Sequence, residues 1–147
     1  LYNGDLETRG VPEAVVRLKE IFYAHPACII CSPEYNGGLT GVLKNTIDWV
    51  SRPIAGDPAW SNGLKPFAGK VLGIMSASPG ALGGIRSLAQ LDLLMTNLQC
   101  WVAPRRFGLS KAGEAFDAQG QLSSEASHKA VQAVVEQTLW ATRKFQA

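Results

Sequence analysis

The segment Ala27-Cys28-Ile29-Ile30-Cys31, with the loop Ser32 to Gly38 and the stretch Leu39 to Ser51 behind it, decides the fold class. The first five residues form a short, continuously apolar run, which predicts a strand buried on both faces of a sheet. The next segment contains Pro and Gly and indicates a loop. Leu39 to Ser51 then places its apolar side chains near one stripe, which predicts a helix. A buried strand leading through a loop into a helix is typical of a parallel α/β sheet.

The same order of elements recurs on both sides of this unit. Apolar spacing predicts three further helices, over Val11 to Tyr23, over Ile85 to Leu98 and over Ser123 to Phe145, the last capped by Ser123. It also predicts two further strands, over Lys70 to Ala77 and, shorter, over Cys100 to Ala103. Pro and Gly indicate a long loop over Arg52 to Phe67 and a glycine-rich turn over Ser78 to Gly84, and Phe107 to Gln121 is expected to be irregular. Strands that alternate with helices pair in parallel, because a parallel return needs a crossover. The sequence therefore predicts one doubly wound α/β domain over residues 1–147.

Composition excludes several functional classes. Hydrophobic residues make up 46% of the chain, charged residues 18%, and the formal net charge is +2 without a basic run, so neither nucleic acid nor an anionic membrane surface is an expected partner. The longest apolar stretch, Ala27 to Cys31, is far too short to span a bilayer. Three cysteines exclude a disulfide scaffold and favour a reducing, cytoplasmic location.

Two loops leave the carboxyl ends of predicted strands, where open parallel sheets bind their ligands. They are Ser32 to Gly38 and Ser78 to Gly84, and both lead directly into a helix. Such loops expose backbone N–H groups at a helix N-terminus, and glycine lets a flat ring approach the backbone. Ordinary turn chemistry explains both loops equally well. Loop composition alone therefore leaves a ligand site and a plain connection both open.

The residue order in and after the first loop is more specific. Pro33-Glu34-Tyr35-Asn36-Gly37 is followed by Gly41-Val42-Leu43-Lys44-Asn45-Thr46-Ile47-Asp48-Trp49 and by Ser51-Arg52-Pro53. Together these segments closely resemble the signature of the NADPH-dependent FMN reductase family, a flavodoxin-like family that includes quinone, azo-dye and chromate reductases. The second loop, with Ser78-Pro79-Gly80, Gly83-Gly84 and then Arg86, resembles the second flavin-contacting loop of that family.

The resemblance implies a three-layer α/β/α fold in which the FMN ring lies between the two loops. The residues implied to bind the cofactor are Pro33, Glu34, Tyr35 and Asn36 in the first loop and Ser78, Pro79, Gly80 and Gly83 in the second. The flavin carries the hydride and electron chemistry, so no catalytic side chain is expected. NAD(P)H is the implied donor. The implied acceptor is a small molecule: a quinone, an azo or nitro compound, free flavin or an oxidised metal ion.

The resemblance also implies a homodimer or homotetramer, in which Glu34 meets Arg86 across a subunit interface. Cys28 and Cys31 form a C-x-x-C, but residues three apart on a strand face opposite sides of the sheet. We therefore expect two buried core cysteines there, and no metal site.

Compared with the family's order of elements, the first residues of this sequence correspond to a point after the second strand. Leu1-Tyr2-Asn3-Gly4-Asp5-Leu6 resembles the stretch that leads out of the family's second strand. The first strand, the phosphate-binding loop, the first helix and the second strand are therefore expected to be missing from the sequence. Two alternatives to an enzyme stay open. One is a non-catalytic flavin-binding or electron-transfer protein, and the other is an inactive fragment of the family.

Overall fold

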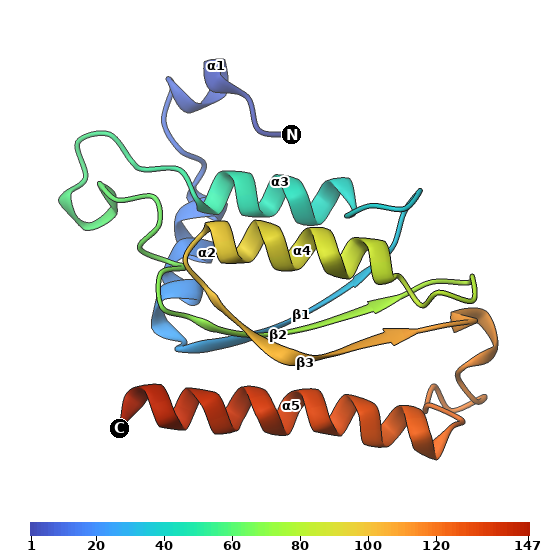
Figure 1. Cartoon of the computed structure of the whole chain (residues 1–147). Helices are drawn as coiled ribbons and strands as arrows, with labels where there is room; N and C mark the ends of the chain where they lie inside the picture. Colours follow the sequence, from blue (N-terminus) through green and yellow to red (C-terminus); the bar gives the residue numbers. More distant parts are fainter.

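Three parallel strands form the central sheet of the computed structural model, which describes all 147 residues (Figure 1). The strands are β1 (Ala27–Pro33), β2 (Val71–Ala77) and β3 (Trp101–Leu109), and they pair in the order β1-β2-β3. β1 and β2 align without a break from Ala27 opposite Val71 to Pro33 opposite Ala77. The register of β2 against β3 shifts between Leu72 and Ile74, so β3 is irregular.

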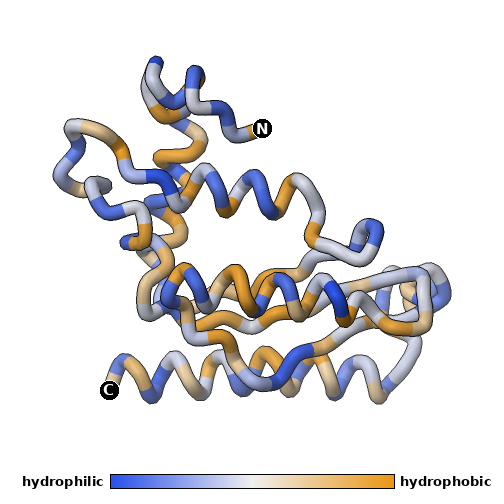
Figure 2. The backbone as a smooth tube through the Cα atoms, turned by 45° about the horizontal axis from the view of Figure 1, so that its top comes forward, coloured by the Kyte–Doolittle hydropathy of each residue, from blue (hydrophilic) through white to orange (hydrophobic).

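Helices cover both faces of this sheet. α2 (Glu13–Ala24), α3 (Gly41–Val50) and α4 (Ile85–Asn97) lie on one side, and α5 (Glu125–Gln146) lies along the other (Figure 1). This three-layer arrangement confirms the expected flavodoxin-like α/β architecture. Along α4 and α5 hydrophobic and hydrophilic residues alternate, as expected of helices with one face on a sheet (Figure 2).

The main core fills the space between the sheet and the helices α3 and α4. Its fully buried members include Val50 of α3, Leu72 and Ile74 of β2, and Met95 of α4. On the opposite face, α5 approaches β2 closely at Gly73. A Cβ on Gly73 would lie 2.5 Å from Thr138 Oγ1, so only glycine lets α5 pack at this distance.

Most elements lie within two residues of their predicted bounds, but the extent of β3 and the cap of the last helix were predicted wrongly, and three short elements were not predicted. β3 continues to Leu109, although a short strand over Cys100 to Ala103 and an irregular segment from Phe107 were expected. The last helix is capped by Ser124, whose side chain accepts from Ser127 N, and not by Ser123. A four-residue helix, α1 (Gly4–Glu7), and the 3-10 turns Pro58–Trp60 and Ala112–Glu114 were not predicted.

β1 forms one edge of the sheet, and its expected burial on both faces was wrong. Ile30 and Ser32 are buried under the α3 and α4 layer, whereas Ile29 is 38% exposed and Cys31 and Pro33 are exposed. The reason is position, since β1 has a neighbouring strand on one side only and α5 runs beneath β2 and β3 more than beneath β1.

Candidate functional site

The two predicted loops lie next to each other at the carboxyl edge of the sheet. The last residues of β1 and β2, Pro33 and Ala77, are register partners, so the chain leaves both strands at the same edge. The loops then lead into α3 and α4, whose N-termini lie side by side at this end of the molecule (Figure 1). The structure thus brings the predicted cofactor-binding residues of both loops to one place.

The first loop is a tight two-residue turn. Tyr35 N donates to Gly38 O at 3.1 Å and Gly38 N donates to Tyr35 O at 3.0 Å. The residues between them, Asn36 and Gly37, have φ values of 51° and 74°. Two positive φ values in sequence characterise a type I′ turn, for which Asn-Gly is the favoured dipeptide. The turn leaves the side chain of Tyr35 64% exposed beside the loop.

The second loop is held by the segment that follows β3. Ser78 N donates to Leu109 O at 3.0 Å, while Ala112 N and Lys111 N donate to Ser78 O and Gly80 O at 3.0 and 3.1 Å. The Ser78 hydroxyl accepts from Gly80 N at 3.2 Å. The start of this loop is therefore fixed from three directions, with Pro79 and Gly80 exposed above it.

Gly83 has a packing role in this loop. A Cβ on Gly83 would lie 2.5 Å from the carbonyl oxygen of Gly108 in β3, and the residue is buried. The close approach of the loop backbone to β3 is sufficient reason for a glycine at this position, whether or not a ligand binds there. That Gly83 also contacts a cofactor stays a prediction.

Glu34 joins the two loops, a role that sequence reasoning missed. The N-cap residue of α4 is Gly84, which has no side chain to cap the helix. The Glu34 carboxylate supplies the cap from outside: its Oε2 accepts from Arg86 N at 3.0 Å and from Ser87 N at 3.1 Å. The side chain of Glu34 is only 8% exposed, and an anion is favourable at a helix N-terminus. No local signal predicts this cap, because Glu34 is 52 residues from Arg86.

Glu34 and Arg86 also form an ion pair within one chain, with 3.7 Å between Glu34 Oε1 and Arg86 Nη1. The Glu34 carboxylate is therefore satisfied without a second subunit. The guanidinium of Arg86 remains 61% exposed. Contact between these residues across a subunit interface stays a prediction.

Backbone donors without a partner in the chain occur in both loops. The N–H groups of Asn36 and Gly37 in the first loop, and of Ala81 and Leu82 in the second, donate no hydrogen bond within the protein. All four residues are at least partly exposed. Such N–H groups suit a ligand with electron-rich oxygen or nitrogen atoms along its edge.

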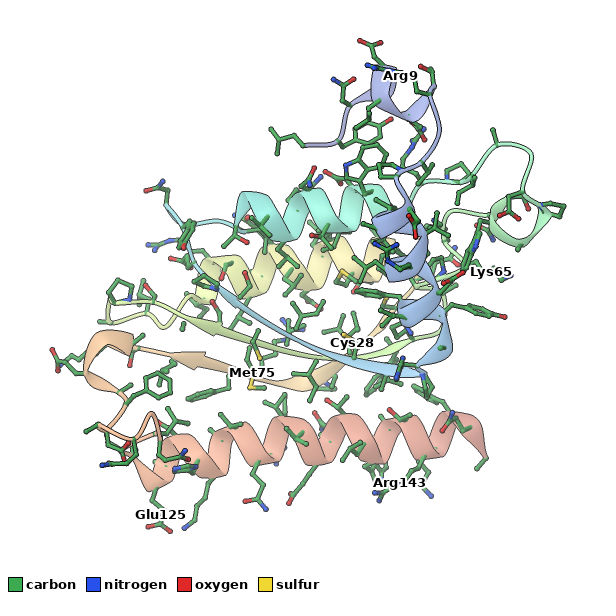
Figure 3. The ribbon with its side chains drawn as sticks, turned by 180° about the vertical axis from the view of Figure 1, so that it is seen from behind. Arg9, Cys28, Lys65, Met75, Glu125 and Arg143 are labelled. Carbon is green, nitrogen blue, oxygen red and sulfur yellow. The ribbon has the colours of Figure 1, made fainter.

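An apolar cavity of about 300 Å³ lies on the α5 face of the sheet at the same end. Its lining includes Cys31 and Pro33 of β1, Met75 of β2 and Phe107 of β3. Figure 3 shows Met75 on the side of the sheet that faces α5. Although Cys31 is exposed as a residue, partial burial of its thiol in the cavity raises the pKa of that thiol.

The C-x-x-C is divided between the two faces, as its spacing predicts. Cys28 packs against the core under α3 and α4, whereas Cys31 lines the cavity on the α5 face. The expectation that both are buried core residues was wrong for Cys31, which is exposed because β1 is an edge strand. No cluster of three or more His, Cys, Asp or Glu side chains is placed to hold a metal ion. None of the helices combines the length and the apolar character needed to cross a membrane.

The layers, the parallel sheet and the paired loops at its carboxyl edge define a flavodoxin-like α/β protein. FerB, a flavoenzyme NAD(P)H:(acceptor) oxidoreductase from Paracoccus denitrificans, has a similar structure, with a TM-score of 0.81 at 27% sequence identity over 98% of this chain and 75% of FerB. The model of the NADPH-dependent FMN reductase family matches residues 1–114. The chain therefore belongs to the NADPH-dependent FMN reductase family, as the loops predicted.

Two further relatives are similar in sequence. An NAD(P)H-dependent FMN reductase from Pseudomonas aeruginosa is 38% identical over 147 aligned residues, which cover 97% of this chain and 74% of the relative. A quinone reductase from Pseudomonas putida is 35% identical over 127 residues, which cover 85% of this chain and 63% of the relative. Both relatives are longer than this chain. The expected family, with FMN as its cofactor and NAD(P)H as its electron donor, is confirmed.

Proposed function

We propose that the two loops bind the ring of FMN and that the protein transfers electrons from NAD(P)H to a small acceptor. The observation that carries this proposal is the set of partnerless backbone N–H groups at Asn36, Gly37, Ala81 and Leu82, gathered on adjoining loops at the carboxyl edge of the sheet. The flavin ring has carbonyl oxygens and ring nitrogens along one edge, which match such donors. Membership of the family supports the same ligand.

Within this site the protein supplies oriented hydrogen-bond donors and an apolar surface for the ligand. The Asn36 and Gly37 N–H groups are fixed by the type I′ turn, so they are oriented before a ligand arrives. The exposed ring of Tyr35 offers an apolar surface for a flat ligand. Bound FMN would supply the hydride and electron chemistry. No side chain of the loops is required to act as an acid or base.

The proposed acceptor is a small molecule such as a quinone, an azo or nitro compound, free flavin or an oxidised metal ion. A ring held at the surface between two loops selects weakly for the shape of the acceptor. A quinone is the first acceptor to test, because a quinone reductase is among the relatives. The three free cysteines support a reducing compartment, the cytoplasm, as the location.

We further propose that two copies associate through α4. Ile85, Ala89 and Leu93 follow one another at four-residue spacing on its exposed face, and Leu82 precedes them. Leu93 is 74% exposed and Ile85 is 59% exposed, which is unusual for large apolar side chains on one helix stripe. A second copy packing on this stripe would form a homodimer, and a tetramer would need a further contact.

Titration of the purified, flavin-free protein with FMN, followed by assays of NADPH oxidation with a quinone, tests the proposal. We expect binding, and we expect Tyr35→Ala to weaken it about tenfold through loss of the ring contact. Tyr23→Ala is the matched control, since Tyr23 is 57% exposed but packs on Trp60 in another part of the molecule.

Each alternative has its own result in these assays. A protein that takes up FMN but does not oxidise NADPH would be an electron-transfer protein. A protein that binds no FMN would be a catalytically inactive member of the family.

A further inference from the structure

Gln90 of α4 anchors the outgoing arm of the first loop. Its side-chain Nε2 donates to Gly37 O at 3.1 Å, and its Oε1 accepts from Leu39 N at 3.3 Å. Only one orientation of the amide satisfies both partners, because Leu39 N is a donor and Gly37 O is an acceptor. One side chain therefore binds the backbone on both sides of Gly38.

The loop rests directly on this part of α4. A Cβ on Gly38 would lie 3.2 Å from Gln90 Oε1, and a Cβ on Gly37 would lie 3.4 Å from Arg86 Cδ. Gln90 follows Arg86 by four residues, so both lie on the same face of the helix. On that face Glu34 meets the first turn of α4, and the segment Gly37 to Leu39 meets the second. Each arm of the loop is thus bound to α4 through one side chain, Glu34 before the turn and Gln90 after it.

The turn needs the second anchor for its orientation. The hydrogen bonds between Tyr35 and Gly38 fix the internal shape of the turn, but they do not connect it to the rest of the fold. Glu34 anchors the arm before the turn through the N-terminus of α4. After the turn, Gln90 binds Leu39 N, one residue before Thr40. Thr40 is the N-cap residue of α3, and its hydroxyl accepts from Leu43 N. Without Gln90, the loop would be hydrogen-bonded to α4 through Glu34 alone, and the orientation of the turn relative to α4 would be less fixed.

We propose that Gln90 is a positioning residue of the FMN site: its amide holds the partnerless N–H groups of Asn36 and Gly37 where the flavin ring meets them. The ligand in this statement rests on the function proposed above, whereas the anchoring rests on the hydrogen bonds of this chain alone. Gln90 need not touch the ligand. Its effect passes through Gly37 and Leu39.

The test measures loop order and ligand affinity separately. Hydrogen exchange of the Leu39 amide, followed by NMR on the flavin-free protein, reports the anchoring, and a titration with FMN reports the affinity. For Gln90→Ala we expect the Leu39 amide to exchange about tenfold faster and FMN to bind about tenfold more weakly, since both bonds are lost. The melting temperature should stay close to that of the wild type, because alanine is a good helix former.

Two further variants make the result specific. Gln90→Glu keeps an oxygen for Leu39 N but turns a second oxygen toward Gly37 O. We expect this variant to restore the protection of Leu39 and to leave FMN binding weak. Gln119→Ala is the matched control, because Gln119 is exposed, its side chain makes no hydrogen bond within the protein, and it lies outside both loops. It should change neither quantity.

Unchanged exchange of Leu39 in Gln90→Ala would overturn the anchoring. Faster exchange with unchanged FMN affinity would overturn the positioning role. A wild-type chain that binds no FMN would remove the proposed function, and the exchange rates of the flavin-free protein would still show whether Gln90 holds the loop.

Discussion

At the scale of single residues, the site depends on glycines that have no room for a side chain. Gly84, the N-cap residue of α4, has a φ of 81°, and a Cβ there would lie 2.1 Å from Ser76 Oγ. The Ser76 hydroxyl is buried and shares a 2.8 Å hydrogen bond with Ser87. It therefore cannot move aside without losing that bond. Gly84 fixes how closely the start of α4 approaches β2.

We expect Gly84→Ala to lower the free energy of unfolding by about 2–4 kcal/mol, from the strained backbone and the steric overlap together. Gly113→Ala is the matched control, since a Cβ on Gly113 would have no atom within 4 Å, and it should change the free energy of unfolding by less than about 0.5 kcal/mol. Urea denaturation of both variants measures the difference. Equal effects of the two substitutions would contradict the steric argument.

At the scale of elements, the sequence predicted the parts with strong periodicity and missed those fixed by distant contacts. The apolar run of β2 and the stripe of α4 contain their own signals, and both elements lie where they were expected. β3 was predicted too short because Pro104 and two arginines interrupt its apolar pattern, as an edge strand allows.

The site shows the same division between local and distant signals. The Asn36-Gly37 turn follows from local chemistry, so its place in the site was predictable. The cap of α4 by Glu34 depends on a residue far away in the sequence, so no pattern could reveal it.

Another contact between distant elements is the buried amine of Lys19. This α2 side chain is fully buried, and its Nζ donates to Val50 O at 2.7 Å and to Arg52 O at 2.5 Å, at the C-terminus of α3. A cation is favourable at a helix C-terminus. Burial nevertheless lowers the pKa of Lys19 from 10.5 to about 8. The folded protein therefore holds this proton less tightly than the unfolded chain does.

We expect Lys19→Met to lower the free energy of unfolding by about 1–3 kcal/mol at pH 7, because two carbonyls lose their donor. Between pH 8 and 10.5 the unfolded chain keeps the lysine proton and the folded protein releases it, so the contribution of Lys19 to stability rises with pH. The stability difference between wild type and Lys19→Met should therefore widen across this range. Denaturation curves at several pH values measure it. Lys129→Met, which removes an exposed lysine paired with Glu125, should show no such widening.

At the scale of the whole molecule, the proposed dimer makes the apolar stripe of α4 a buried surface. We expect Leu93→Glu to convert the dimer to a monomer, because it would place a charge among Ile85, Ala89 and Leu93 of the two copies. Sedimentation velocity measures the change. Leu139→Glu adds the same charge on α5, at a side chain that is 46% exposed, and should leave the dimer intact. A wild-type protein that sediments as a monomer at all concentrations would contradict the proposed dimer.

The two edges of the sheet differ in how they resist unwanted pairing. β3 carries a proline, adjacent arginines and an irregular register, the features by which natural edge strands avoid joining other strands. The seven residues of β1 contain no charge, and they align with β2 without a bulge. Apart from Pro33 at its end, β1 therefore presents a regular, uncharged outer edge to which a further strand can pair.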